Sequence, residues 1–142
     1  MVEVKNKKAY FDYTILNEIE AGIALTGTEI KSVRKGSIDL KDTFVNIKNN
    51  EAYVLNMYIA KYEEGNIFNH DERRTRKLLL HKSEIKKLKE QIKIEGLTII
   101  PLKLYFKKNK VKLLIGVCKG KKLYDKRESL KEKDLKREAR YY

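Results

Sequence analysis

The sequence contains one cysteine, one proline and no tryptophan among its 142 residues. Because Cys118 is the only cysteine, no disulfide can form within the chain, which fits a reducing compartment. No segment approaches the roughly 20 apolar residues of a membrane span, and the opening stretch MVEVKNKK lacks the apolar centre of a signal peptide. We therefore expect a cytoplasmic protein without a membrane partner. With Pro101 as the only proline and no Gly/Ser-rich linker, we expect no flexible interdomain connection in the first 119 residues.

Positive charge is abundant and lies along the whole chain. Thirty-three Lys and Arg residues oppose 20 Asp and Glu residues, giving a net charge of +13. Residues 1–119 hold 24 basic and 15 acidic residues, and residues 120–142 hold nine and five. Such an excess favours polyanionic partners, because neutralising phosphates releases their condensed counterions. A merely soluble, lysine-rich protein is the alternative.

Alternating apolar residues predict mostly strands between residues 10 and 118. Segments 9–16 and 21–27 are rich in aromatic and branched residues, and alternation over 44–59 predicts a hairpin that turns at Asn49–Asn50. A second hairpin is predicted over 102–117, with its turn at 108–110. Two helices are expected, one from a cap at Thr28 to Gly36 and one from a cap at Ser83 to Gly96. This pattern predicts a mainly β protein with helices: a small, partly closed antiparallel barrel of the oligonucleotide-binding (OB) type.

The last 23 residues differ from the rest. Leu123, Leu130 and Leu135 are their only large aliphatic side chains, and their spacing gives no continuous helical stripe. We therefore expect a barrel over 1–119 and a basic tail over 120–142 that is disordered when free and helical against a template. A surface helix packed on the barrel is the alternative.

Signals for catalysis are weak. His70 and His81 are the only histidines, and their spacing matches no metal motif known to us. Cys118 ends an alternating strand, which favours a small core residue over a nucleophile. We expect no metal, no cofactor and no catalytic residue. Two alternatives stay open at this point: a small nuclease using His70, His81 and nearby carboxylates, and a generic or ribosomal OB-fold RNA-binding protein.

Signals for RNA binding are broader. Basic residues cluster near several predicted element ends, and nine tyrosines offer stacking faces. From these clusters we expect RNA contacts at Lys7, Lys31, Arg34, Arg76 and Lys77.

Five segments, taken together, resemble a known family. NKKAYFDY (6–13), EAGIALTGTEIKSVRKG (20–36), RTRKLLLHKSEI (74–85), PLKLYFK (101–107) and GVCKGKKLYDKRE (116–128) occur in this order. Their combination resembles the SmpB family, the SsrA-RNA-binding proteins of bacterial trans-translation. The resemblance implies a non-enzymatic OB-type adaptor that binds the tRNA-like domain of transfer-messenger RNA (tmRNA). Delivered with elongation factor Tu and GTP, the complex would enter the A site of a stalled ribosome so that the nascent peptide is tagged for degradation.

The resemblance also implies site residues. Further tmRNA contacts are expected at Asn6, Glu20, Leu79, Lys112, Gly120, Lys121 and Lys122. Glu20 would accept hydrogen bonds from base amino or imino groups, or else form a structural salt bridge. Leu79 would pack on an exposed base, or else belong to the core, and strand alternation by itself points Lys112 outward.

In the tail, the resemblance implies a role on the ribosome. Tyr124 would stack at the decoding centre, and Asp125, Lys126 and Arg127 would act in the message channel of the small subunit, which is lined with ribosomal RNA. A channel already filled by message would leave the tail no room to fold. We expect this competition to sense stalling.

Overall fold

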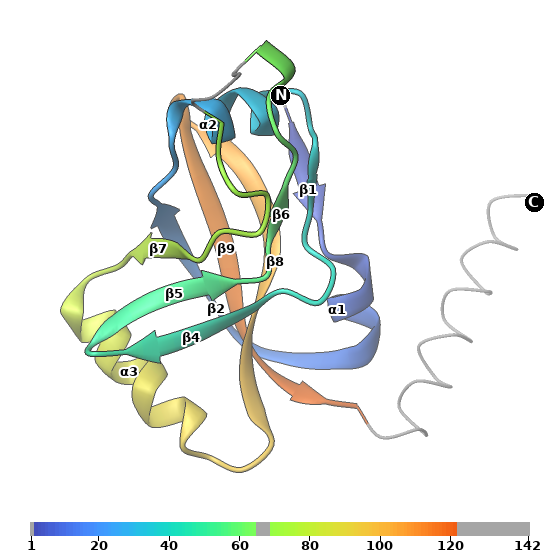
Figure 1. Ribbon diagram of the computed structural model, residues 1–142. Helices are drawn as coiled ribbons and strands as arrows, with labels where there is room; N and C mark the ends of the chain where they lie inside the picture. Colours follow the sequence, from blue (N-terminus) through green and yellow to red (C-terminus); the bar gives the residue numbers. More distant parts are fainter. Residues whose placement is uncertain (1, 65–68, 122–142) are drawn as a thin grey trace, which may run out of the picture.

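The computed structural model describes residues 2–64 and 69–121, which form nine strands and three α-helices (Figure 1). The helices are α1 (Lys7–Asp12), α2 (Gly27–Arg34) and α3 (Lys82–Ile92). The strands are β1 (Glu3–Lys5), β2 (Tyr13–Ile23), β3 (Ile38–Asp39), β4 (Phe44–Lys48), β5 (Glu51–Leu55), β6 (Tyr58–Ile59), β7 (Arg76–Leu79), β8 (Leu97–Lys107) and β9 (Lys110–Gly120). No helix of the described part is long and apolar enough to cross a membrane.

Seven strands form one antiparallel sheet in the order β1-β8-β9-β2-β7-β5-β4, and β3 pairs with β6 separately. The sheet curls so that β4 comes close to β8, but no ladder of the described strands joins the two. The prediction of a mainly β, OB-like fold with helices is confirmed, and the sheet is not closed into a barrel. We call the gap between β4 and β8 the open seam.

Both predicted hairpins are confirmed, and their turns explain their register. Asn49 and Asn50 have φ of 52° and 58°, and Lys108 and Asn109 have φ of 51° and 64°. Two consecutive residues with positive φ form the type I′ turn, whose twist matches that of the flanking strands. Each turn therefore fixes which residues of its two strands lie opposite each other, with their side chains on the same face of the sheet.

Three predicted boundaries are corrected. Segment 9–16 is not all strand, because residues 9–12 belong to α1 and β2 begins only at Tyr13. The cap of α2 is Thr26 instead of Thr28, since Thr26 and Glu29 exchange side chain-to-backbone hydrogen bonds as a capping box. The third helix begins one residue before Ser83, with His81 at its N-cap.

The core lies inside the curl of the sheet and under α3. Leu88 of α3 is fully buried with Leu104 of β8 and Leu113 of β9. Cys118 is also fully buried, and burial raises the pKa of its thiol to about 11. Cys118 is therefore a small core residue, as its place in an alternating strand predicts.

Candidate nucleic-acid interface

The outer face of the sheet gathers three predicted contacts around one glycine. Across the ladders, Leu79 of β7 faces Gly22 of β2, Gly22 faces Lys112 of β9, and Lys112 faces Tyr105 of β8. Glu20 lies two residues before Gly22 and therefore points to the same side. We call Glu20, Gly22, Leu79, Tyr105 and Lys112 the sheet-face site.

Gly22 shapes this site by having no side chain. A Cβ added at Gly22 would lie 3.1 Å from the Cβ of Leu79, closer than most side chains tolerate. Leu79 can therefore lie against the backbone of β2, and it stays 56% exposed while the neighbouring Leu78 is fully buried. Of the two interpretations of Leu79, the structure supports the exposed one.

Glu20 is held in place by hydrogen bonds. The Tyr105 hydroxyl donates to one of its carboxylate oxygens, and Lys107 Nζ lies 3.4 Å from the other. The hydrogen bond from Tyr105, together with Lys107 and the charge of Lys112, lowers the pKa of Glu20 although burial opposes this. Burial and the bond to Glu20 raise the pKa of Tyr105 to about 12. The side chain of Glu20 is still 33% exposed, so the salt bridge leaves its carboxylate accessible to a donor.

A cavity of about 520 Å³ adjoins the site between β2, β7 and the start of α3. Glu20, Leu79 and Lys112 line it, together with Lys77, whose Nζ lies 3.5 Å from a Glu51 oxygen. Exposed ion pairs of this kind contribute little to stability, so Lys77 can exchange its partner for a phosphate.

The other predicted lysines and arginines lie elsewhere. Lys31 and Arg34 are exposed on α2, and Lys31 Nζ lies 5.3 Å from the ring centre of Tyr62. Lys7 is exposed at the start of α1. Gly120 ends β9 and Lys121 follows it beside α1, where the Lys121 amide donates to the Asp12 carbonyl at 2.9 Å. The predicted residues thus form several basic areas instead of one.

Two predicted contacts have structural roles. Arg76 is fully buried: its guanidinium donates to Glu29, to the Met57 carbonyl at 2.6 Å and to the Glu72 carbonyl at 3.2 Å. Arg76 therefore belongs to the core, and RNA cannot reach it in this conformation.

Asn6 is also buried and serves as the N-cap of α1. Its Oδ1 accepts from the Ala9 amide at 3.1 Å, and its Nδ2 donates to the carbonyls of Leu40 and Pro101. The geometry shows that Asn6 joins α1 to two other segments, and its expected RNA contact stays a prediction.

One residue of the nuclease alternative, His70, is already occupied by hydrogen bonds. His70 Nε2 donates to the Ile59 carbonyl at 2.9 Å, and its Nδ1 lies 2.9 Å from the Thr28 hydroxyl oxygen. His81 is exposed at the N-cap of α3. Among residues 2–64 and 69–121, no three metal-ligating side chains come together.

The remaining predicted site residues lie outside the described part of the chain. These are Lys122, Tyr124, Asp125, Lys126 and Arg127, together with the expected helix of the tail.

Three residues at or beside the sheet-face site are not among the predicted RNA contacts. Gly22 lies two residues from Glu20 on β2, whereas Tyr105 and Lys107 reach Glu20 only through pairing between β2, β8 and β9. The signal available in advance was the alternation of Tyr105 and Lys107 with the apolar residues of their strand, which places both on the outer face.

Comparison with known proteins gives a consistent family assignment. The SmpB protein family model matches residues 3–141. An SsrA-binding protein of Staphylococcus epidermidis is 60% identical over 134 residues, covering 94% of this chain and 86% of its own length. One from Ligilactobacillus salivarius is 57% identical over 136 residues, covering 96% and 88%.

A solved structure also resembles the fold. It is described as "tmRNA-SmpB: a journey to the center of the bacterial ribosome", and its matching chain is 45% identical with a TM-score of 0.74. The match covers 90% of this chain and 94% of that one. The resemblance noted in the sequence is confirmed: this chain belongs to the SmpB protein family.

Proposed function

We propose that this protein is a non-enzymatic adaptor that binds the tRNA-like domain of tmRNA and brings it to the A site of stalled ribosomes. Its relatives are named SsrA-binding proteins, and the similar solved structure is described as tmRNA-SmpB in the bacterial ribosome. In this role the small subunit and its ribosomal RNA are further partners. Elongation factor Tu with GTP takes part through the tmRNA complex.

The observation that carries the proposal is the sheet-face site. Three strands bring Glu20, Leu79 and Lys112 together around Gly22. Lysines contact phosphates, whereas a carboxylate can accept hydrogen bonds from base amino or imino groups. Unpaired RNA loops expose those groups, and an exposed leucine offers them an apolar surface. The site therefore suits a folded RNA with unpaired bases.

In this proposal the protein binds RNA and catalyses no reaction. His70 is committed to two hydrogen bonds, and the raised pKa of Cys118 keeps its thiol protonated at neutral pH. Residues 1–119 form the RNA-binding body, and residues 120–142 probe the message channel through Tyr124, Asp125, Lys126 and Arg127. Lys121 and Lys122 lie where the two parts join.

A charge reversal tests the sheet-face site. Glu20→Arg removes the acceptor for base donors, so we expect it to abolish preferential binding of a tRNA-like-domain fragment over bulk transfer RNA. Binding is measured by gel shift at ~0.2 M salt, where non-specific binding is weak. Circular dichroism verifies the fold of the variant.

Glu95→Arg is the matched control, because Glu95 is exposed in the loop between α3 and β8 and the charge change is identical. This variant should keep the preference. Equal binding of all RNAs by the unmodified protein would instead indicate a generic RNA-binding protein, and RNA cleavage lost in a His70→Ala/His81→Ala variant would indicate a nuclease.

A further inference from the structure

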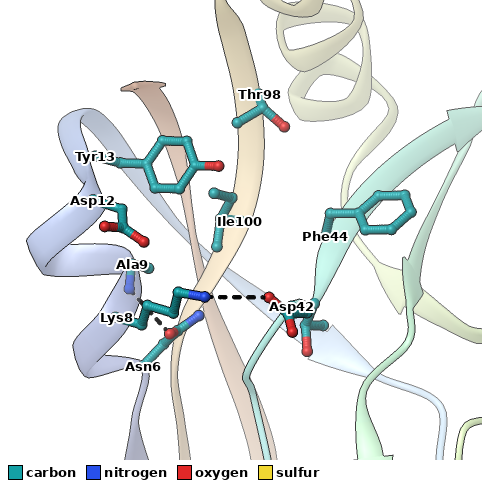
Figure 2. Close-up of a pocket in the computed structure, with 10 residues that line it drawn as sticks. Asn6, Lys8, Ala9, Asp12, Tyr13, Asp42, Phe44, Thr98 and Ile100 are labelled. Atoms are coloured by element: carbon teal, nitrogen blue, oxygen red, sulfur yellow. Dashed lines mark hydrogen bonds and ion pairs between the residues drawn. The ribbon is translucent and has the colours of Figure 1, made fainter. Parts of the chain in front are cut away.

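A second cavity, of about 390 Å³, lies at the open seam (Figure 2). It is bounded by α1, by the segment leading into β4 and by the first half of β8, and it shares no lining residue with the cavity beside the sheet-face site. Its volume is within the range of sites for small organic groups. The function proposed above does not use it.

Aromatic and aliphatic side chains form its apolar walls. Figure 2 shows the ring of Tyr13 reaching over Ile100 from the α1 side, with Phe44 on the other side of the cavity. Phe44 is 45% exposed, although phenylalanine is among the residues most often buried in proteins. Aromatic rings at the rim of a cavity offer a stacking surface to a planar base.

The polar edge of the cavity is an ion pair. Lys8 Nζ lies 3.7 Å from Asp42 Oδ1, and both side chains are more than half exposed. Such a pair is weak, so both groups can turn to a ligand. Together they present one donor group, the Lys8 ammonium, beside the two acceptor oxygens of Asp42.

This pattern is complementary to guanine. The pairing edge of guanine carries the O6 acceptor followed by two donors, N1–H and the N2 amino group. Lys8 can donate to O6 while the Asp42 carboxylate accepts from both donors. Adenine and cytosine each offer only one donor group on that edge, and uracil offers a single N–H between two acceptors. Guanine alone satisfies the pair with three hydrogen bonds.

The backbone fixes the position of the carboxylate. Asp42 has φ of 56°, a conformation that Asp and Asn tolerate better than most residues. Its carbonyl accepts a hydrogen bond from Asn56 Nδ2 at 3.1 Å. The acceptor therefore stands on a constrained turn directly before β4.

We propose that this seam cavity binds one unpaired guanine of an RNA, stacked on Tyr13 and Phe44 and read by Lys8 and Asp42. The inference rests on the proposed function only in that the partner is RNA. The guanine can come from tmRNA or from ribosomal RNA, and the chemistry of recognition is the same for both.

The test uses the full chain and heptamer RNAs with a single central G, A, C or U among uridines. We expect the G-containing heptamer to bind at least about 5-fold more tightly than the others, the lower range for one bidentate base contact. Asp42→Asn should abolish this preference, because the amide replaces one acceptor by a donor while keeping the backbone conformation. Phe44→Ala should weaken binding of all four heptamers and most strongly that of the G-containing one.

Leu16→Ala is the matched control for Phe44→Ala. Leu16 is 55% exposed on β2 and does not line the cavity. Leu16→Ala and Glu20→Arg should both keep the guanine preference, and its survival in Glu20→Arg separates this site from the sheet-face site. Equal binding of the four heptamers, a preference for another base, or a preference that persists in Asp42→Asn would overturn the proposal.

Two further arms identify the source of the base. If Phe44→Ala weakens binding to the tRNA-like-domain fragment, the guanine belongs to tmRNA. If it weakens only binding to small ribosomal subunits, the guanine belongs to ribosomal RNA. An effect on neither large RNA would overturn a role in either complex.

Discussion

At the scale of single residues, the strongest constraint on this molecule is the buried pair of Glu29 and Arg76. Both side chains are fully buried, and Arg74 adds a second hydrogen bond to Glu29 at 2.7 Å. Burial raises the pKa of Glu29, but hydrogen bonds from Arg74, from the Thr26 amide and from Arg76 outweigh it and hold the pKa at about 2. The carboxylate thus joins the start of α2 to β7.

Loss of the Glu29 charge should therefore destabilise the fold. We predict that Glu29→Gln lowers the free energy of unfolding by ~3–5 kcal/mol, because it leaves the Arg76 charge buried without a counterion. Urea unfolding followed by circular dichroism measures this.

The effect should depend on pH in one direction. Since folding lowers the pKa of Glu29, its contribution is complete above about 4.5 and is lost as pH falls towards 2. The difference between wild type and Glu29→Gln should shrink over that window. Glu95→Gln, which changes an exposed carboxylate, should cost little at any pH, and a difference that stayed constant down to pH 2 would contradict this account.

At the scale of elements, the β8–β9 turn contains a local conflict. Lys108 adopts φ of 51°, a conformation that costs most residues with a side chain about 1 kcal/mol but suits Asn. We predict that Lys108→Asn raises the free energy of unfolding by about 0.5–1 kcal/mol.

Lys110→Asn removes the same charge from the strand position on the other side of the turn, where φ is not positive, and is the control. Thermal unfolding compares the two variants. Equal effects would mean that charge, and not backbone conformation, determines the change.

Helix α3 carries a row of lysines. Lys82, Lys86, Lys89 and Lys93 are spaced by four, three and four residues, so they share one face of the helix. All four line a groove of about 620 Å³ between α3 and the Asn49–Asn50 turn.

This groove meets the cavity of the sheet-face site at Glu51, Lys82 and Ile85. We predict that Lys86→Gln reduces the slope of log affinity against log salt by roughly 0.7–0.9 for the tRNA-like-domain fragment. Lys87→Gln, on another face of α3, should leave the slope unchanged. The same loss in both variants would mean that only total charge matters.

The elements themselves could be predicted wherever local chemistry decides them. The two hairpins follow from alternation and from asparagine-containing turns. The charge of Arg76 predicts a surface position, although Arg76 alternates with the buried Leu78 in β7 and so shares its inward face. What makes that burial possible is Glu29, 47 residues away, and no local pattern reveals such a partner. The position of Leu79 and Lys112 on either side of Gly22 likewise depends on the order of strands in the sheet.

At the scale of the whole molecule, the proposed function assigns tmRNA binding to residues 1–119 and probing of the message channel to residues 120–142. The described surface holds the proposed RNA sites, and the last 21 residues lie outside the described part. We predict that truncation after Leu123 leaves tmRNA binding nearly intact but stops peptide tagging in a reconstituted trans-translation assay.

The triple replacement of Asp125, Lys126 and Arg127 by alanine should reproduce this separation in a full-length chain. If truncation abolished tmRNA binding and tagging together, the tail would have to be counted as part of the RNA-binding surface.

The Glu29–Arg76 pair also constrains how the sequence can diverge. Replacing either partner alone leaves a desolvated charge, whereas replacing both by apolar side chains of similar volume is often tolerated. The two positions should therefore be inherited as a unit. Among descendants of this gene, an apolar residue at 29 should be found together with one at 76, and single exchanges should be rare.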